Sequence, residues 1–312
     1  MENLTIAVSA VIPFLIFLVI GYAGRKSGIV REKFLRELNS VNFKCFFPFV
    51  MFNNLYKMEF DSLAEGTYIV FAVTATVILL LVSWITVPVI VKEDRRRSVV
   101  IQAIYRSNAV LFAIPLAGSV CGEAGMEKAS LLTAFIIPLY NISAVILLEY
   151  YRGGKVSVKS MGINILKNPI IKGAIAGFLF AVSPLEMPDF LGEPITQLAG
   201  MATPLALFVL GGTLHFSHLR KNLACLAAGS ALKLAVVPGV IIAAMHRMGF
   251  DGAELFAVFC MFATPVATAS YPMAQSMGAD GDLAGEFVVV TTAASIFTMF
   301  LWILFLKNTG MV

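Results

Sequence analysis

The sequence predicts an all-α integral membrane protein with ten transmembrane helices. Of its 312 residues, 59% are hydrophobic and only 13% are charged, and the mean hydropathy is +0.86. A soluble globule of this size needs more charged side chains to cover its surface. Two of the apolar segments also contain prolines and polar residues, at corresponding places in the two halves of the chain. Interrupted segments of this kind are typical of the binding site of a secondary transporter.

Ten segments reach or approach the length of about 20 apolar residues that crosses a bilayer. The third is uncharged throughout, and the sixth is short and begins at Asn168-Pro169. The first ends at Arg25-Lys26 without a cleavage signal, so we expect it to be retained. The ten segments are 4–24, 38–58, 67–91, 99–121, 129–150, 168–184, 192–214, 222–246, 253–277 and 286–306.

Basic residues between the segments predict the orientation. The four connections after the first, third, fifth and seventh segments hold most of the Lys and Arg, whereas the opposite side shows only Lys57, Lys128, Arg247 and Lys307. The connection 278–285 has no Lys or Arg. Because basic loops stay in the cytoplasm, we expect a multi-pass protein of the cytoplasmic (inner) membrane with both termini extracytoplasmic.

The two halves of the chain look duplicated. Prolines recur in the same order at near-equal offsets: Pro13 and Pro169, Pro48 and Pro204, Pro115 and Pro272, and, at a shorter offset, Pro88 and Pro238. With five segments in each half, an odd number, the second half must be inserted upside down. The sequence therefore predicts two inverted five-helix repeats, 1–150 and 168–312, joined by a short cytoplasmic linker, 151–167.

The fourth and ninth segments are expected to be broken near the middle of the membrane. Proline removes a backbone donor and disfavours helix at the preceding residue, so we expect breaks near Pro115 and near either Pro265 or Pro272. A broken backbone is tolerated in lipid only where it lines protein or water. The N-terminal end of each second half-helix would attract an anion. For a single segment, a kink satisfied by Ser or Thr would be the simpler interpretation.

Polar side chains near these breaks are the candidate substrate-binding residues. Asn108 offers both a donor and an acceptor, although it could instead bond a neighbouring helix. Arg106 is expected to line the inner mouth as a gating residue. The remaining candidates, besides the three prolines, are Ser107, Thr264, Thr268, Ser270, Asn53 and Asn141.

Lys233 lies midway along the eighth segment, where insertion of a cation costs about 2.5–3.5 kcal/mol. All 19 acidic residues fall in loops or near segment ends. The partner of Lys233 is therefore an anionic substrate, water or backbone carbonyls, and substrate-binding and structural roles both stay open. A proton antiporter usually keeps an acid in the membrane core. Coupling to sodium through carbonyl and hydroxyl oxygens, or to protons, also stays open.

Other site classes find little support in the sequence. The four cysteines stand singly in apolar stretches, which is typical of buried free thiols. His215 and His218 lack a third metal ligand, so we expect a solvated loop and no metal or other cofactor. The glycine pairs Gly118/Gly122 and Gly173/Gly177 indicate close helix packing. The chain has no basic stripe interleaved with aromatics, so nucleic acid is not an expected partner.

The motifs together resemble the auxin efflux carrier family, bacterial branch, over essentially the whole chain. The matching pieces are Leu38-Asn39, Pro48 to Asn53, Arg106 to Asn108, Ile114 to Leu116, Asn168-Pro169, Pro204 to Phe208 with Gly211-Gly212, and Pro265 to Tyr271 with Gly278 to Asp280. The resemblance implies the fold of bile-acid/sodium symporters and sodium/proton antiporters, in which the fourth and ninth helices cross. It also implies transport of organic anions, such as auxin in plants and malate or malonate in bacterial permeases.

In that family an asparagine near the crossing matches Asn108, and the crossing prolines match Pro115 and either Pro265 or Pro272. The long hydrophilic loop of the plant carriers is replaced by 151–167. We therefore expect a secondary transporter that moves a small organic anion by alternating access, with the lipid bilayer around it and a homodimer as one possible assembly. The alternatives are a ligand sensor with a transporter fold and a membrane-embedded enzyme, for which Glu123 and Glu127 are too little; we expect no catalytic residues.

Overall fold

The computed structural model describes residues 2–57, 66–152, 158–183, 187–214 and 216–312, without side-chain detail for 2–10, 110, 158 and 216–218. The described chain is helical apart from one isolated β-bridge between Ser107 and Val266. The helices, with π turns marked η, are α1 (Glu2–Lys26), α2 (Glu32–Val41), η1 (Asn42–Phe46), α3 (Phe47–Tyr56), α4 (Thr67–Ile90), α5 (Asp94–Tyr105), η3 (Ala109–Ala113), α6 (Ile114–Tyr150), α7 (Val158–Lys167), α8 (Pro169–Ala181), α9 (Asp189–Thr213), α10 (Phe216–Lys221), α11 (Leu223–Ala231), η4 (Leu232–Val236), α12 (Val237–Arg247), α13 (Gly252–Ala263), α14 (Ser270–Met277) and α15 (Gly281–Asn308).

Five helical stretches of the described chain are long and apolar enough to cross a membrane: Thr67–Ile90, Leu111–Tyr150, Asp189–Thr213, Leu223–Arg247 and Gly281–Asn308. A sixth results if the pair Lys159–Lys167 and Pro169–Ala181, bent by 70°, is one span. Part of the expected linker 151–167 is thus the helix α7. The structure supports an all-helical, multi-pass membrane protein.

The fourth segment breaks earlier than the sequence predicts. Helix α5 ends at Tyr105, the backbone of Arg106 is extended, and helical structure resumes at Ala109. The prediction of a break near Pro115 is therefore wrong. Pro115 lies in the first turn of α6, directly after the π turn η3. Proline has no N–H to donate, but the wider π turn accommodates it, so the helix does not unwind there. Further along α6, Gly122 has φ 66° and ψ −152°, so two helices meet there at a turn.

The ninth segment breaks around Pro265. Helix α13 ends at Ala263 and α14 begins at Ser270, which places Pro265 in the gap and Pro272 in the first turn of α14. Thr264 has the extended geometry (φ −70°, ψ 155°) that a following proline favours. Of the two prolines left open by the sequence, Pro265 is therefore the one at the break.

All three π turns of the described chain end two residues before a proline. The turns η1, η3 and η4 precede Pro48, Pro115 and Pro238. Proline cannot donate the i→i−4 hydrogen bond, and its ring crowds the carbonyl of residue i−4. The wider π turn relieves that crowding, so each helix continues past its proline.

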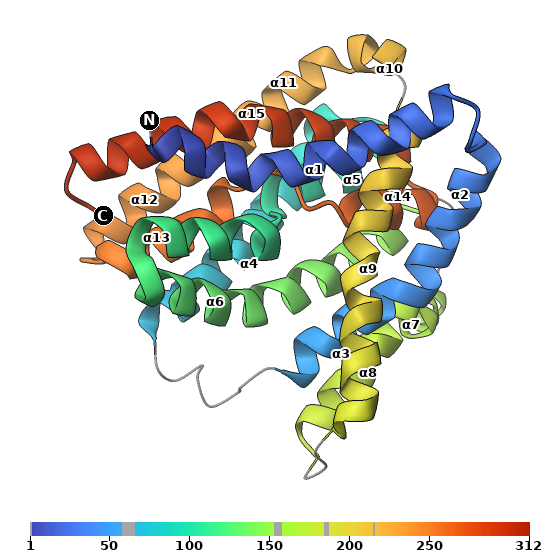
Figure 1. The fold of residues 1–312 in the computed structure, drawn as a ribbon, viewed down its shortest axis with the longest axis horizontal. Helices are drawn as coiled ribbons and strands as arrows, with labels where there is room; N and C mark the ends of the chain where they lie inside the picture. Colours follow the sequence, from blue (N-terminus) through green and yellow to red (C-terminus); the bar gives the residue numbers. More distant parts are fainter. Residues whose placement is uncertain (1, 58–65, 153–157, 184–186, 215) are drawn as a thin grey trace.

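The helices pack as two bundles, one of α1, α2, α3, α8 and α9 and the other of α4 to α6 with α11 to α15. In Figure 1, α2, α3, α8 and α9 lie together on the right, and α1 crosses from them to lie beside α15. Within the first bundle, α1 packs on α9 and α3 on α8. A Cβ on Gly21 would lie 1.9 Å from the carbonyl oxygen of Phe208, and one on Gly177 would lie 2.5 Å from that of Phe52. The expected close packing is confirmed for Gly173 and Gly177. It is wrong for Gly122, where an added Cβ would meet no atom within 4 Å. Close backbone contact fixes this bundle internally.

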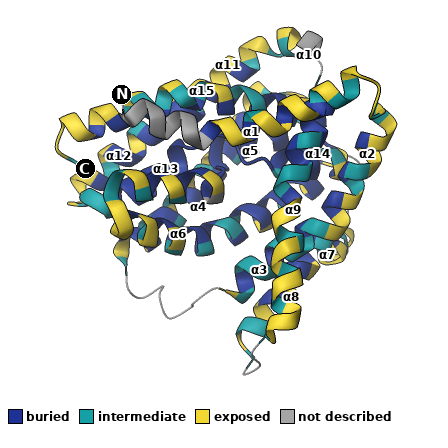
Figure 2. Ribbon diagram, viewed as in Figure 1, coloured by how far each residue is buried: buried dark blue, intermediate teal, exposed yellow. Residues whose placement is uncertain are grey.

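The centre of the molecule is the most buried part (Figure 2). From Leu255 to Ala263, every residue of α13 is fully buried, as a helix that is apolar all round requires. Apolar side chains are exposed on the outer faces of α1, α4, α8 and α15, where lipid would contact them. In Figure 1 the two termini lie on one side of the molecule, and α10 and the start of α2 lie on the opposite side.

Candidate functional site at the helix crossing

The two breaks meet each other inside the second bundle. The amide of Asn108 donates to the carbonyl oxygen of Pro265 at 2.8 Å, and Ser107 and Val266 form an antiparallel bridge. The amide of Val266 donates to the hydroxyl of Thr291 on α15 at 3.1 Å. The two breaks therefore form hydrogen bonds with backbone N–H and C=O groups that each would otherwise leave unpaired. Unpaired backbone groups are costly in a low-dielectric surrounding.

Arg106 lies in the break of the fourth segment with its side chain 2% exposed. Its guanidinium donates to Gln102 Oε1 at 3.1 Å, to Met273 Sδ at 3.2 Å and to Asn141 Oδ1. All three acceptors are neutral, and Nε has no partner. Among the described residues, no carboxylate pairs with Arg106. A buried cation held only by neutral groups favours an anion beside it.

A second buried cation stands behind the crossing. Lys233, in the π turn η4, is fully buried and its ammonium donates to the hydroxyl of Ser107. The buried carboxylates Glu149 and Glu286 bond to Asn164 and Asn222, not to Lys233. Among the described residues, no carboxylate pairs with this ammonium, which lies next to the unwound backbone.

A cavity of about 430 Å³ opens in front of the crossing. One end is polar, and Arg106 provides its charged group. The body is apolar and aromatic, with Phe14, Phe17, Phe47, Val50, Leu111, Ile137 and Leu207. The lining also includes the polar residues Asn53, Asn54 and Thr196, and Thr196 donates to Asn53 Oδ1 at 3.5 Å. The cavity thus combines a single positive end with a mainly apolar body.

Unused hydrogen-bond donors point to the same end. The Nδ2 of Asn108 has no partner although it is buried. Thr268 and Ala269 line the cavity, and within the described chain their amides donate no backbone hydrogen bond. They immediately precede the N-terminus of α14 at Ser270. Consecutive free amides before a helix N-terminus form a site that attracts an anion.

The structure places the predicted site residues in three groups. Those lining the cavity are Asn108, Ser107, Thr268, Asn53, Asn141 and Arg106, the last of them at the crossing itself. Those at the crossing but outside the lining are Thr264, Pro265, Ser270 and, behind Ser107, Lys233. Pro115 and Pro272 lie in the first turns of α6 and α14.

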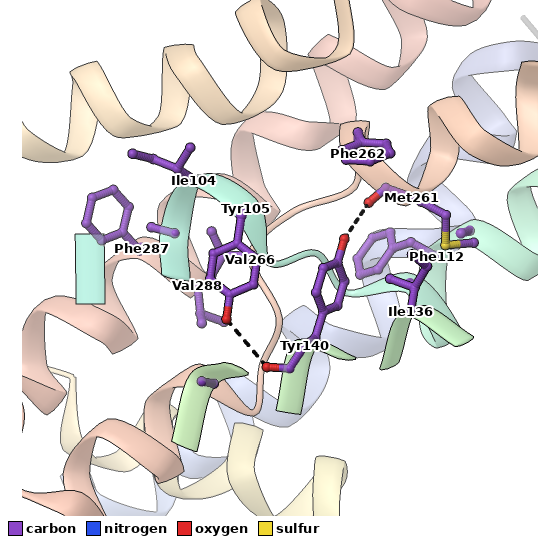
Figure 3. Packing of buried hydrophobic residues seen from close by; sticks show 14 of the residues in the cluster. Ile104, Tyr105, Phe112, Ile136, Tyr140, Met261, Phe262, Val266, Phe287 and Val288 are labelled. Carbon is purple, nitrogen blue, oxygen red and sulfur yellow. Dashed lines mark hydrogen bonds between the residues drawn. The ribbon is translucent and has the colours of Figure 1, made fainter. Parts of the chain in front are cut away.

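Several residues of the site carried no signal in the sequence. Tyr140 lines the cavity and donates to the carbonyl oxygen of Met261 at 3.3 Å, which ties α6 to the end of α13 (Figure 3). Thr291 lies in the apolar helix α15, and nothing in the sequence indicates that its hydroxyl accepts a hydrogen bond from the amide of Val266. Gln102 could have been found, because it precedes Arg106 by four residues and so shares its helix face.

Within the described residues, no three His, Cys, Asp or Glu side chains gather as a metal site. His215 lies outside the described residues, and so does the side chain of His218. The four cysteines are free, but only Cys260 is buried; Cys45 is exposed. The prediction of free thiols is confirmed, and that of burial is wrong for Cys45.

Comparison with known proteins gives consistent matches over nearly the whole chain. The profile of the family described as "Membrane transport protein" matches residues 6–161 and 154–303. An uncharacterized transporter of Methanothermobacter thermautotrophicus is 22% identical over 302 residues, covering 94% of this chain and 96% of that protein. An uncharacterized transporter of Methanocaldococcus jannaschii is 22% identical over 310 residues, covering 95% and 98%. The chain belongs to this membrane transport protein family, the family of the auxin efflux carriers.

Proposed function

We propose that the protein is a secondary transporter that moves an organic anion across the cytoplasmic membrane. The observation that carries this proposal is the buried guanidinium of Arg106 at the end of the cavity, held only by neutral acceptors. The unpartnered side-chain Nδ2 of Asn108 and the free backbone amides of Thr268 and Ala269 also line this cavity beside the crossing. A carboxylate there would gain charge-assisted hydrogen bonds that the empty site lacks.

The lining favours an anion with one carboxylate and an apolar body. Arg106 is the only charged residue among those that line the cavity. The rest of the lining is neutral, so the second carboxylate of a short diacid such as malate would have no cation beside it, and an unpaired charge is disfavoured there. An aromatic or branched monocarboxylate would instead bury its apolar part against these side chains.

The proposed architecture is ten spans in two inverted repeats. Gly21 and Gly177 differ by 156 in number, and so do their backbone contacts Phe52 and Phe208. At the crossing, Asn108 and Pro265 differ by 157 and bond to each other, as residues near a two-fold axis would. Pairs of contacts that recur at the same offset support a repeat more strongly than recurring prolines do. They show that the two halves pack alike, whereas the prolines show only that the halves share a residue type.

The proposed mechanism is alternating access, with the bundle that contains the crossing moving against the other in an elevator-like way. Polar contacts between the bundles gather on α14: Asn39 donates to Ser276 at 3.3 Å, and Thr213 pairs with Tyr271 at 2.7 Å. With the predicted orientation, α14 is at the cytoplasmic side, and the cavity is lined by the middle and the extracytoplasmic parts of α1, α3 and α9. This arrangement is that of an outward-facing transporter.

Uptake into liposomes tests the proposal. Purified protein should accumulate a labelled aromatic monocarboxylate, such as phenylacetate, more than malate or malonate. Arg106→Gln should abolish uptake and Asn108→Ala should lower it about tenfold, since about 1.4 kcal/mol corresponds to one lost hydrogen bond to a charged group. Repeating the assay with sodium and pH gradients tests the proposed coupling to sodium or protons.

The control is Lys92→Gln, which removes an exposed cation far from the cavity. Normal uptake by Arg106→Gln would contradict the anion site. Preference for malate over every monocarboxylate would contradict the assignment of the apolar lining but leave a transporter.

A further inference from the structure

A second cavity, of about 580 Å³, lies on the outer face of the first bundle, between α3, α8 and α9. It is separate from the crossing and shares no lining residue with the cavity described above. Its lining consists of two lysines, Lys44 and Lys172, together with Pro48, Phe49, Phe52, Pro169, Gly173, Ala176 and Ile195. Two cations beside an otherwise apolar groove are an unusual combination on a surface that faces lipid.

The packing of the helices places both lysines at the same end of the groove. Gly173 contacts the backbone of Pro48, and Gly177 contacts that of Phe52, so α8 and α3 run parallel in this region. Lys172 precedes the first contact by one residue and Lys44 precedes it by one helical turn. The two ammonium groups therefore lie at a similar depth, and the apolar residues Phe52 and Ala176 follow on the other side of the contact.

Neither ammonium has a partner within the described chain. Both side chains are exposed, and no hydrogen bond or ion pair to a described residue is formed by either. Lys44 lies in the π turn η1 and Lys172 in the first turn of α8, within two predicted membrane segments. A lysine in this position directs its ammonium toward the interface, where phosphate groups of lipids are the available counter-ions.

We propose that this groove binds an anionic phospholipid of the cytoplasmic leaflet. The phosphate lies between Lys44 and Lys172, and one acyl chain follows Phe49, Phe52 and Ala176 along the groove. The charge argues for a lipid and against a second copy of the protein as the occupant. A two-fold interface through this groove would bring four like-charged lysines together, which is unfavourable without intervening anions.

Binding is tested on purified, delipidated protein in neutral detergent. Added phosphatidylglycerol should raise the unfolding temperature, whereas phosphatidylcholine and soluble glycerol phosphate should not. The variant Lys44→Gln with Lys172→Gln should weaken phosphatidylglycerol binding about thirtyfold, about fivefold for each lysine. The matched control, Lys33→Gln with Lys92→Gln, removes two exposed lysines outside the groove and should bind like the unchanged protein.

A second variant keeps the charges and fills the groove. Ala176 is exposed to the groove, so Ala176→Phe should block the acyl chain and abolish the lipid response without unfolding the bundle. An equal response to phosphatidylcholine, or an unchanged response of both groove variants, would overturn the proposal. A change in oligomeric mass of the groove variants with an intact lipid response would also overturn it, in favour of an interface between copies.

Discussion

At the scale of single residues, two buried cations distinguish the crossing from an ordinary helix kink. Arg106 faces the cavity, and Lys233 approaches the same unwound segment from behind through Ser107. Neither has a carboxylate partner among the described residues. The two side chains therefore have separate tasks: Arg106 is available to a ligand, whereas Lys233 holds the backbone that presents it.

This division of tasks predicts different results for Lys233 and Arg106. Lys233→Ala removes the hydrogen bond to Ser107 and leaves a void, so we expect a loss of stability of about 2–4 kcal/mol and weaker uptake. Lys233→Gln, which keeps a donor, should recover part of both. Thermal unfolding and initial uptake rates measure this, with Lys92→Ala as the exposed control. A fully stable Lys233→Ala that lacks substrate binding would instead make Lys233 a binding residue.

At the scale of elements, prolines have two different effects on these helices. Pro115 follows a π turn and is accommodated within the helix, as are Pro48 and Pro238. Pro265 stands in the gap between α13 and α14 and holds Thr264 extended. Proline therefore widens a helix where a π turn precedes it. It interrupts the helix at Pro265, where the backbone pairs with another segment instead.

We expect Pro265→Ala to impair uptake more than Pro115→Ala. Alanine at 265 lets α13 continue by another residue and weakens the pairing with Asn108, whereas alanine at 115 only restores a donor inside a helix. A reduction of about tenfold or more for Pro265→Ala, against less than about threefold for Pro115→Ala, corresponds to a difference of about 1 kcal/mol. The reverse order of the two variants would mean that Pro115 defines the functional break.

The glycine contacts of the first bundle give a second prediction at this scale. Gly177→Ala places a methyl group 2.5 Å from the carbonyl oxygen of Phe52, so we expect a loss of about 1–3 kcal/mol in the free energy of unfolding. Gly162→Ala, in the open helix α7, meets no atom within 4 Å and should stabilise slightly. Chemical denaturation in detergent compares the two; equal effects would show that α3 and α8 can separate without cost.

At the scale of the whole molecule, the two bundles share few polar contacts, and these gather on α14. Asn39, Thr213 and Asn168 all reach residues of that helix. Within the first bundle, by contrast, glycines bring backbones into direct contact. A rigid bundle beside one that is held by a few hydrogen bonds is the arrangement that relative movement requires.

Cross-linking tests this movement. In a cysteine-free background, Asn39→Cys with Ser276→Cys joins the bundles where the native side chains are 3.3 Å apart. Oxidation should stop uptake and reduction should restore it. The matched control, Lys128→Cys with Glu254→Cys, joins two helices of the second bundle where the native side chains form an ion pair at 3.0 Å, outside the cavity lining, and should leave uptake unchanged when oxidised. Continued transport by the first oxidised pair would contradict movement of the bundles.

Much of this could be predicted from the sequence because it depends on local chemistry. The third segment was expected at 67–91 and is the helix Thr67–Ile90, since an uncharged run of this length has no alternative in lipid. Asn168 caps α8, as its position before Pro169 indicates. The break at Arg106 to Asn108 was predicted in the wrong place, near Pro115. A proline indicates a lost backbone hydrogen bond, but it does not indicate whether the helix unwinds there or continues through a π turn.

The sequence by itself determined that this is an all-helical membrane protein, and it indicated the polar residues that a membrane interior tolerates only at a site. Each of these follows from the energy of placing one side chain or one peptide group in lipid. Only the tertiary structure decided that Pro265 pairs with Asn108, that Lys233 bonds to Ser107, and that Arg106 faces an apolar cavity. The two hydrogen bonds join residues 157 and 126 positions apart, and no local energy specifies which distant partner will satisfy a buried polar group.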